Sequence, residues 1–190
     1  MKLFTTLFNE IDQTTKTNAK VAALLAYFKK ASEKDLIYAI ALLTGNRPKR
    51  PVKTSALREW AAERASIPSW LFDDSYYVVG DLAETIALLL PEATSNIDYS
   101  LHEIIIALEK IGKLPEEEKK EPVLNYWDSL TPTELFIFNK LITGNFRIGV
   151  SKQLGIKALA QFVEKEDTSI AHILMGKLNP EKESLETLFT

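Results

Sequence analysis

The sequence repeats itself along its length. Leu25-Ala26-Tyr27-Phe28 corresponds to Leu124-Asn125-Tyr126-Trp127, an offset of 99 residues, and the same offset places Leu42-Leu43-Thr44-Gly45-Asn46 on Leu141-Ile142-Thr143-Gly144-Asn145. After the two Thr-Gly-Asn sequences the offset shortens to 96, which matches Ser55 with Ser151. A repeat of this length predicts two structurally similar halves within one chain.

The repeat also predicts the organisation of the chain. We place the first half at about residues 18–90, the second at about 119–189, and an acidic helical connector between them at about 91–118. A length of 190 residues suits one domain of ordinary size. We therefore expect a single pseudo-two-fold domain over residues 1–190.

Each half contains an apolar run with a capping signal at either end. A capping box precedes each run, and a glycine follows it where a left-handed C-cap is expected. The caps leave about twelve residues per run, a usual helix length, which favours a helix over a buried strand. Because both runs are apolar around their circumference, we expect the most buried helix of each half. The boxes are Ser32-x-x-Asp35 and Thr131-x-x-Glu134, and the glycines are Gly45 and Gly144.

The rest of the chain also predicts helices, with one exception. Apolar residues recur with a 3.6-residue period at 4–11, 21–28 and 101–108. Pro115 should open a further helix that Pro122 ends or kinks, and Ser151 should cap another. Only Tyr76–Val79 predicts a short strand, ended by Gly80. The fold class is therefore all-α.

Composition and termini exclude several classes of protein. The longest apolar runs are too short to span a bilayer, and the first residues lack a secretory signal. We therefore expect a cytoplasmic protein without a membrane partner. The chain has no cysteine, which excludes disulfides, thiolate nucleophiles and cysteine zinc sites.

Positive charge is concentrated in two windows that contain no acidic residue. The windows are 36–58 and 135–163, and with a net charge of −3 for the chain the remaining residues carry an excess of acid. A polyanion responds to a local patch of charge rather than to the total, so this segregation favours nucleic acid as a partner. The nine cations are Arg47, Lys49, Arg50, Lys53, Arg58, Lys140, Arg147, Lys152 and Lys157.

No arrangement of residues in the chain predicts an active site or a metal site. Gly45 through Thr54 resembles a P-loop, but Val52 stands where that loop needs its second glycine. His102 and His172 lack the spacing of zinc ligands. The tryptophans (Trp60, Trp70 and Trp127) fit helical spacing and are expected in the core rather than stacked on bases.

The two Thr-Gly-Asn turns are the candidate site. Glycine allows backbone N–H groups to approach a phosphate closely, and a following helix start adds free N–H groups and a partial positive charge. Such contacts recognise the backbone of a duplex rather than its base sequence. The candidate DNA-binding residues are Gly45, Arg47, Lys49, Arg50, Gly80, Gly144, Asn145, Arg147, Gly149, Ser151 and Lys152.

The second turn also carries a resemblance to a known family. Thr143-Gly-Asn-Phe-Arg-Ile-Gly-Val-Ser151 resembles the most characteristic segment of the N-terminal domain of ATP-dependent DNA ligases, in particular the bacterial branch. Val79-Gly-Asp-Leu-Ala-Glu84 and Leu43-Thr-Gly-Asn-Arg-Pro-Lys-Arg50 are similar to two further motifs of that family. The resemblance extends over nearly the whole chain.

The resemblance implies a helical, pseudo-symmetric domain that binds the minor groove around a nick in duplex DNA. It implies nucleotidyltransferase and OB domains as partners, ATP and Mg²⁺ as cofactors of the parent ligase, and a role in DNA repair, replication or recombination. The adenylated lysine of the family lies in Lys-x-Asp-Gly, which does not occur here. We therefore expect a monomeric piece of a longer ligase, without catalytic residues or a cofactor of its own.

Two other interpretations remain open from the sequence. One is a helical protein-interaction scaffold, in which the basic windows are incidental. The other is a stand-alone architectural DNA-binding protein. A scaffold would respond little to salt, whereas both DNA-binding interpretations require strong salt dependence.

Overall fold

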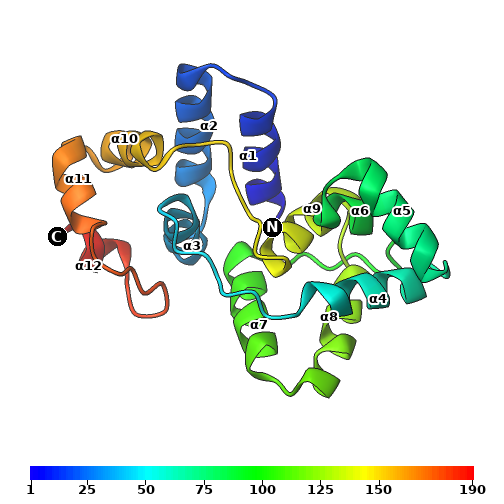
Figure 1. Ribbon diagram of the computed structural model, residues 1–190. Helices are drawn as coiled ribbons and strands as arrows, with labels where there is room; N and C mark the ends of the chain where they lie inside the picture. The colour runs from blue at the N-terminus through cyan, green and yellow to red at the C-terminus, as the bar shows by residue number, and fades with distance from the viewer. The chain divides into compact units, whose positions relative to one another are not determined.

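The computed structural model describes residues 1–190, and every regular element in it is helical (Figure 1). The prediction of an all-α fold is thereby confirmed. None of these helices has the length and apolar character that a membrane crossing needs. The elements are α1 Lys2–Asp12, α2 Thr17–Lys30, α3 Glu33–Leu43, α4 Thr54–Arg64, α5 Ser69–Val79, α6 Leu82–Leu89, α7 Leu101–Lys113, the 3₁₀ turn η1 Glu116–Glu118, α8 Lys120–Trp127, α9 Pro132–Ile142, α10 Lys152–Val163, α11 Asp167–Ile173 and α12 Leu185–Phe189.

The helices form two compact units that do not follow the predicted halves. Unit 1 comprises Met1–Arg47, Ser100–His102 and Ile148–Thr190, and unit 2 comprises Pro48–Tyr99 and Glu103–Arg147. Apart from Ser100–His102, the chain passes from unit 1 to unit 2 after the first Thr-Gly-Asn turn and returns after the second. Each unit therefore combines helices from both halves of the sequence.

In unit 1, α2 is the central element and contacts α1 and α10, as Figure 1 shows. The side chains of Leu24 and Phe28 on α2 are buried, and the ring of Phe28 meets that of Phe162 on α10 edge-on at 5.6 Å. Helix α3, which also contacts α10, is buried from Leu36 to Leu43. This agrees with the prediction that its run, apolar on all sides, would be a buried helix.

In unit 2, α9 packs along α6, which also contacts α4 and α5. Asn139 of α9 is fully buried and joins three helices. Its side-chain oxygen accepts a hydrogen bond from Trp127 Nε1 of α8 at 2.9 Å, and its amide donates to the Ala83 carbonyl of α6 at 3.4 Å. A buried polar side chain that makes both bonds carries no unpaired group, so it fixes the packing of these helices.

Most of the predicted caps form, but neither capping box is complete, since the Asp35 carboxylate accepts from the His102 backbone N–H at 2.9 Å rather than from that of Ser32. Ser32 and Ser151 accept hydrogen bonds from the backbone N–H groups of Asp35 and Leu154, at 3.2 and 3.1 Å. Thr131 caps nothing through its side chain, because its hydroxyl donates to the Glu134 carboxylate at 2.9 Å. The hydroxyl therefore supports a buried carboxylate instead of the helix end.

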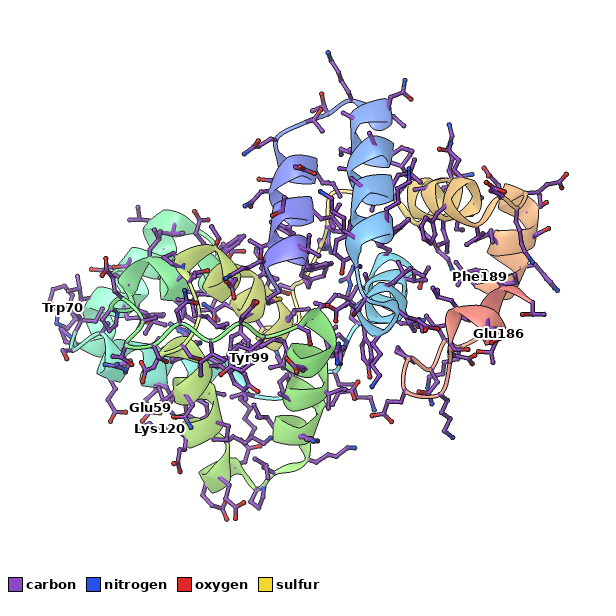
Figure 2. All side chains as sticks on the ribbon, turned by 180° about the vertical axis from the view of Figure 1, so that it is seen from behind. Glu59, Trp70, Tyr99, Lys120, Glu186 and Phe189 are labelled. Atoms are coloured by element: carbon purple, nitrogen blue, oxygen red, sulfur yellow. The ribbon has the colours of Figure 1, made fainter.

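Three further expectations were wrong. Tyr76–Val79 forms no strand and is the last turn of α5, because buried Phe72 and the contact with α6 favour the helix over local β propensity. Pro122 neither ends nor kinks a helix: it lies in the first turn of α8, where a missing N–H costs nothing. Trp127 is core at 1% exposure, but Trp70 projects from α5 and is 64% exposed (Figure 2).

Candidate nucleic-acid interface

The first Thr-Gly-Asn turn ends α3 with a left-handed glycine. The Thr44 hydroxyl donates to the carbonyl of Ile40 at 2.9 Å, and Gly45 follows with a φ of 91°. The Asn46 N–H then donates back to the Ala41 carbonyl at 2.8 Å. These bonds satisfy the last carbonyls of the helix, and the left-handed conformation explains why glycine is required.

The second turn repeats the threonine bond and the left-handed glycine at the end of α9, but Asn145 makes no return bond like that of Asn46. The Thr143 hydroxyl donates to the Asn139 carbonyl at 2.7 Å, and Gly144 has a φ of 72°. Phe146 is then buried, whereas Asn145 and Arg147 are exposed. A buried aromatic residue between two exposed polar residues anchors the turn and directs its polar side chains toward solvent.

Most of the candidate cations form no ion pair. Arg58 and Lys140 are the exceptions among the nine, since they pair with Asp73 and Asp81. The seven others are exposed and form no ion pair: Arg47, Lys49, Arg50, Lys53, Arg147, Lys152 and Lys157. Because none of these side chains forms an ion pair, their charge is available to an external anion, and Lys53 has a carboxylate, that of Glu116, within electrostatic reach.

Unit 2 brings part of the first basic segment against the second turn. A Cβ added to Gly144 would lie 3.5 Å from Cβ of Arg50. Two residues predicted from different halves of the sequence are therefore neighbours, and Lys49, Asn145 and Arg147 are close to them along the chain. Arg50 therefore lies against the turn that also carries Arg147, and both belong to unit 2.

Unit 1 brings the start of α10 against the end of α3. A Cβ added to Gly155 of α10 would lie 3.6 Å from Cβ of Leu43, the last residue of α3. The capped N-terminus of α10, with Ser151 and Lys152, therefore belongs to the same unit as Gly45 and Arg47. The helix start contributes free N–H groups and a partial positive charge beside these residues.

Gly149 has a different neighbourhood from the one that a phosphate-facing glycine requires. A Cβ added there would lie 3.6 Å from Ile11 Cγ2 and 3.7 Å from Lys20 Nζ, so that direction faces α1 and α2. At Gly45, by contrast, nothing lies within 4 Å of an added Cβ. Of the two glycines, Gly45 is therefore the better placed for the close approach of an anion.

Gly80 is a helix cap, and nothing lies within 4 Å of a Cβ added to it. It ends α5 with a φ of 79°, and the side chain of the next residue, Asp81, accepts from the Glu84 N–H at 2.8 Å. Asp81 also pairs with Lys140 of α9. Burial acts to raise the pKa of Asp81, but the hydrogen bond from Lys140 and the charge of that lysine prevail and hold the pKa below its ordinary value.

Two lysines that the sequence analysis did not select contact the candidate segments. Lys20 Nζ donates to the Gly149 carbonyl at 2.5 Å, and Lys119 Nζ donates to the Pro51 carbonyl at 2.9 Å. Neither lysine lies in a basic window, so charge patterning could not identify them. The repeat could have, because an offset of 99 places Lys20 on Lys119.

Comparison with known proteins decides the family. Residues 1–160 match the family described as DNA ligase N terminus. The chain belongs to this family. The match covers both Thr-Gly-Asn turns and the start of α10, so the candidate interface lies within the part that defines this ligase domain.

A curated relative agrees with this assignment. The chain is 26% identical over 167 residues to a protein of Nitrosopumilus maritimus (strain SCM1) named DNA ligase. The alignment covers 80% of this chain and 28% of that relative. The chain thus corresponds to somewhat more than a quarter of the length of that ligase.

Proposed function

We propose that this DNA ligase N-terminal domain binds duplex DNA without sequence preference, at the minor groove around a nick. The observation that carries the proposal is the set of seven exposed cations without ion pairs, which belong to the two chain segments that contain the left-handed glycine turns. Exposed cations attract phosphates, and each phosphate contact releases condensed counterions from the duplex. The turn glycines and the capped start of α10 offer backbone N–H groups to the same phosphates.

The catalytic steps of the proposed parent protein belong to other domains. We infer that the parent protein is an ATP-dependent DNA ligase that acts in DNA repair, replication or recombination. Its nucleotidyltransferase and OB domains would complete the DNA-binding surface around the nick. ATP and Mg²⁺ would bind to those domains, since no Lys-x-Asp-Gly occurs in this chain. The reading frame that encodes the parent protein should contain that motif downstream of residue 190.

Binding titrations at several salt concentrations test the proposed function. If four to seven of the free cations contact phosphates, the logarithm of the association constant falls with the logarithm of salt concentration with a slope of roughly −4 to −6. Two duplexes of unrelated sequence, each prepared intact and with one central nick, separate shape recognition from sequence recognition. We expect equal affinity for the two sequences and higher affinity for the nicked forms.

A flat response to salt would contradict the proposal and favour the protein-interaction scaffold. A strong preference for one sequence would also contradict it, because contacts to phosphates carry no direct information on base sequence.

A further inference from the structure

The two lysines that contact the candidate segments occupy equivalent positions in the repeat. Lys20 lies in the first turn of α2, and Lys119, the residue before Lys120 in Figure 2, immediately precedes α8. Each ammonium group donates to a backbone carbonyl two residues before the N-cap of a following helix. For Lys20 the acceptor is Gly149, before Ser151 of α10, and for Lys119 it is Pro51, before Lys53 of α4.

The equivalence extends to the helices on which the acceptors rest. An added Cβ on Gly149 would contact Ile11, in the last turn of α1, and an added Cβ on Gly112, in the last turn of α7, would contact Pro51. Helices α1 and α7 themselves carry buried apolar residues at the same spacing. These residues are Phe4, Leu7, Phe8 and Ile11 in α1, and Leu101, Ile104, Ile105 and Leu108 in α7.

Each lysine binds one backbone carbonyl of a basic segment, and exposed cations lie before and after that carbonyl in the sequence. Around Pro51 these cations are Arg50 and Lys53, and around Gly149 they are Arg147 and Lys152. A hydrogen bond from a charged group is stronger than one between neutral groups, so each contact restricts the conformation of a segment that has no regular secondary structure of its own.

Neither lysine is itself well placed to serve as a phosphate contact. The Lys119 side chain is only 8% exposed, and it also donates to Glu116 at 2.8 Å. Lys20 is half-buried, and its ammonium group donates a hydrogen bond to the Gly149 carbonyl. Their effect on binding would therefore come through the conformation of the segments rather than through charge.

We propose that Lys20 and Lys119 are a symmetric pair of positioning residues, each of which holds one DNA-contacting segment in its binding conformation. This inference rests on the proposed function. A segment that is ordered before binding loses less conformational freedom when DNA arrives, so affinity rises without any additional contact to DNA.

Methionine substitutions test the proposal, because methionine keeps the length of the side chain and removes the donor. We expect Lys20→Met and Lys119→Met each to lower duplex affinity about tenfold, in line with the loss of a charge-assisted bond that orders a loop. The slope of affinity against salt should stay at the wild-type value, because no phosphate contact is lost. Lys29→Met on α2 and Lys110→Met on α7 remove the same charge from exposed positions outside both windows and serve as matched controls.

Amide hydrogen exchange gives a readout that does not need DNA. Lys20→Met should speed exchange at Val150 and Gly155, whose amides donate to the carbonyls of Ile148 and Ser151. Lys119→Met should speed it at Leu57, whose amide donates to the Lys53 carbonyl, while amides in the middle of α3 and α9 keep their protection. Lys20 is the decisive position if the buried Lys119 variant unfolds.

Three results would overturn the inference: affinity equal to that of the control variants, a salt slope reduced by about one, or unchanged exchange in the segments. A wild-type domain that does not bind duplex DNA would instead overturn the proposed function, while the exchange experiment would still report on the two lysine contacts.

Discussion

The cations of this domain fall into two classes according to their partners. Arg58 lies in a basic window but is paired with Asp73, so its charge is largely neutralised within unit 2. Arg147 lies on the second turn, is exposed and forms no ion pair. Since sequence alone assigns the two arginines to the same kind of window, their difference follows only from the structure. The prediction that Arg147 binds DNA can therefore be tested against a matched arginine from the same chain.

Arg147→Ala should weaken binding to every duplex alike and reduce the salt slope by about one, as expected for the loss of one phosphate contact. Because the side chain is exposed and unpaired, the melting temperature should change little. Arg58→Ala removes the same type of side chain but should leave the salt slope unchanged. Titrations and thermal unfolding on the same samples measure both quantities. Wild-type binding by Arg147→Ala would show that the site is assigned to the wrong residues.

At the scale of single elements, local signals predicted helix ends well where one side chain acts on its own helix. Ser32, Ser151, Gly45 and Gly144 lie at the ends where they were expected, because their capping bonds involve only nearby backbone. Prediction failed where a distant or competing partner decides. Thr131 is engaged by a buried carboxylate, and the β-rich sequence of α5 is overridden by packing on α6. The partner of α5 leaves no signal in a short window of sequence, whereas Glu134 belongs to the predicted capping box itself but accepts from the Thr131 hydroxyl instead of leaving it to the helix end.

The repeat matches Ser151 with Ser55, but the two serines have different roles. Ser151 is the N-cap of α10 and accepts from Leu154, whereas Ser55 is exposed within the first turn of α4 and caps nothing. Ser151→Ala should therefore lower the free energy of unfolding by about 1 kcal/mol, and Ser55→Ala should change it by a few tenths at most. Urea unfolding of both variants measures the difference. Equal losses would mean that the Ser151 cap contributes nothing to stability.

At the scale of the whole molecule, each compact unit packs helices from one half of the sequence against helices from the other half. Helix α2 of the first half packs on α10 of the second, and α9 of the second half packs on α6 of the first. Apolar periodicity predicted which face of each helix is buried but carries no information on which helix covers it. For this reason the repeat was visible in the sequence, whereas the composition of the compact units was not. The same packing between halves explains why Arg50 and Gly144 are neighbours.

The packing between halves predicts that neither half folds alone. Residues 1–90 would expose the face of α2 that α10 covers, and residues 91–190 would expose the face of α9 that α6 covers. We expect each piece to lack a cooperative thermal transition and an equimolar mixture to recover one, because mixing restores both packed pairs. Circular dichroism of the separate and mixed pieces provides the measurement. Cooperative unfolding of either piece by itself would be inconsistent with this packing between halves.

The central proposal is that the cations at each of the two Thr-Gly-Asn turns contact the phosphates of duplex DNA. The most direct measurement compares the salt slope of the wild-type domain on a nicked duplex with the slopes of two variants. One variant replaces Arg47, Lys49 and Arg50 with alanine, and the other replaces Arg147 and Lys152. We expect slopes reduced by about three and about two, and a combined variant in which the two reductions add. A slope that stays at the wild-type value when either turn loses its cations would contradict the proposal.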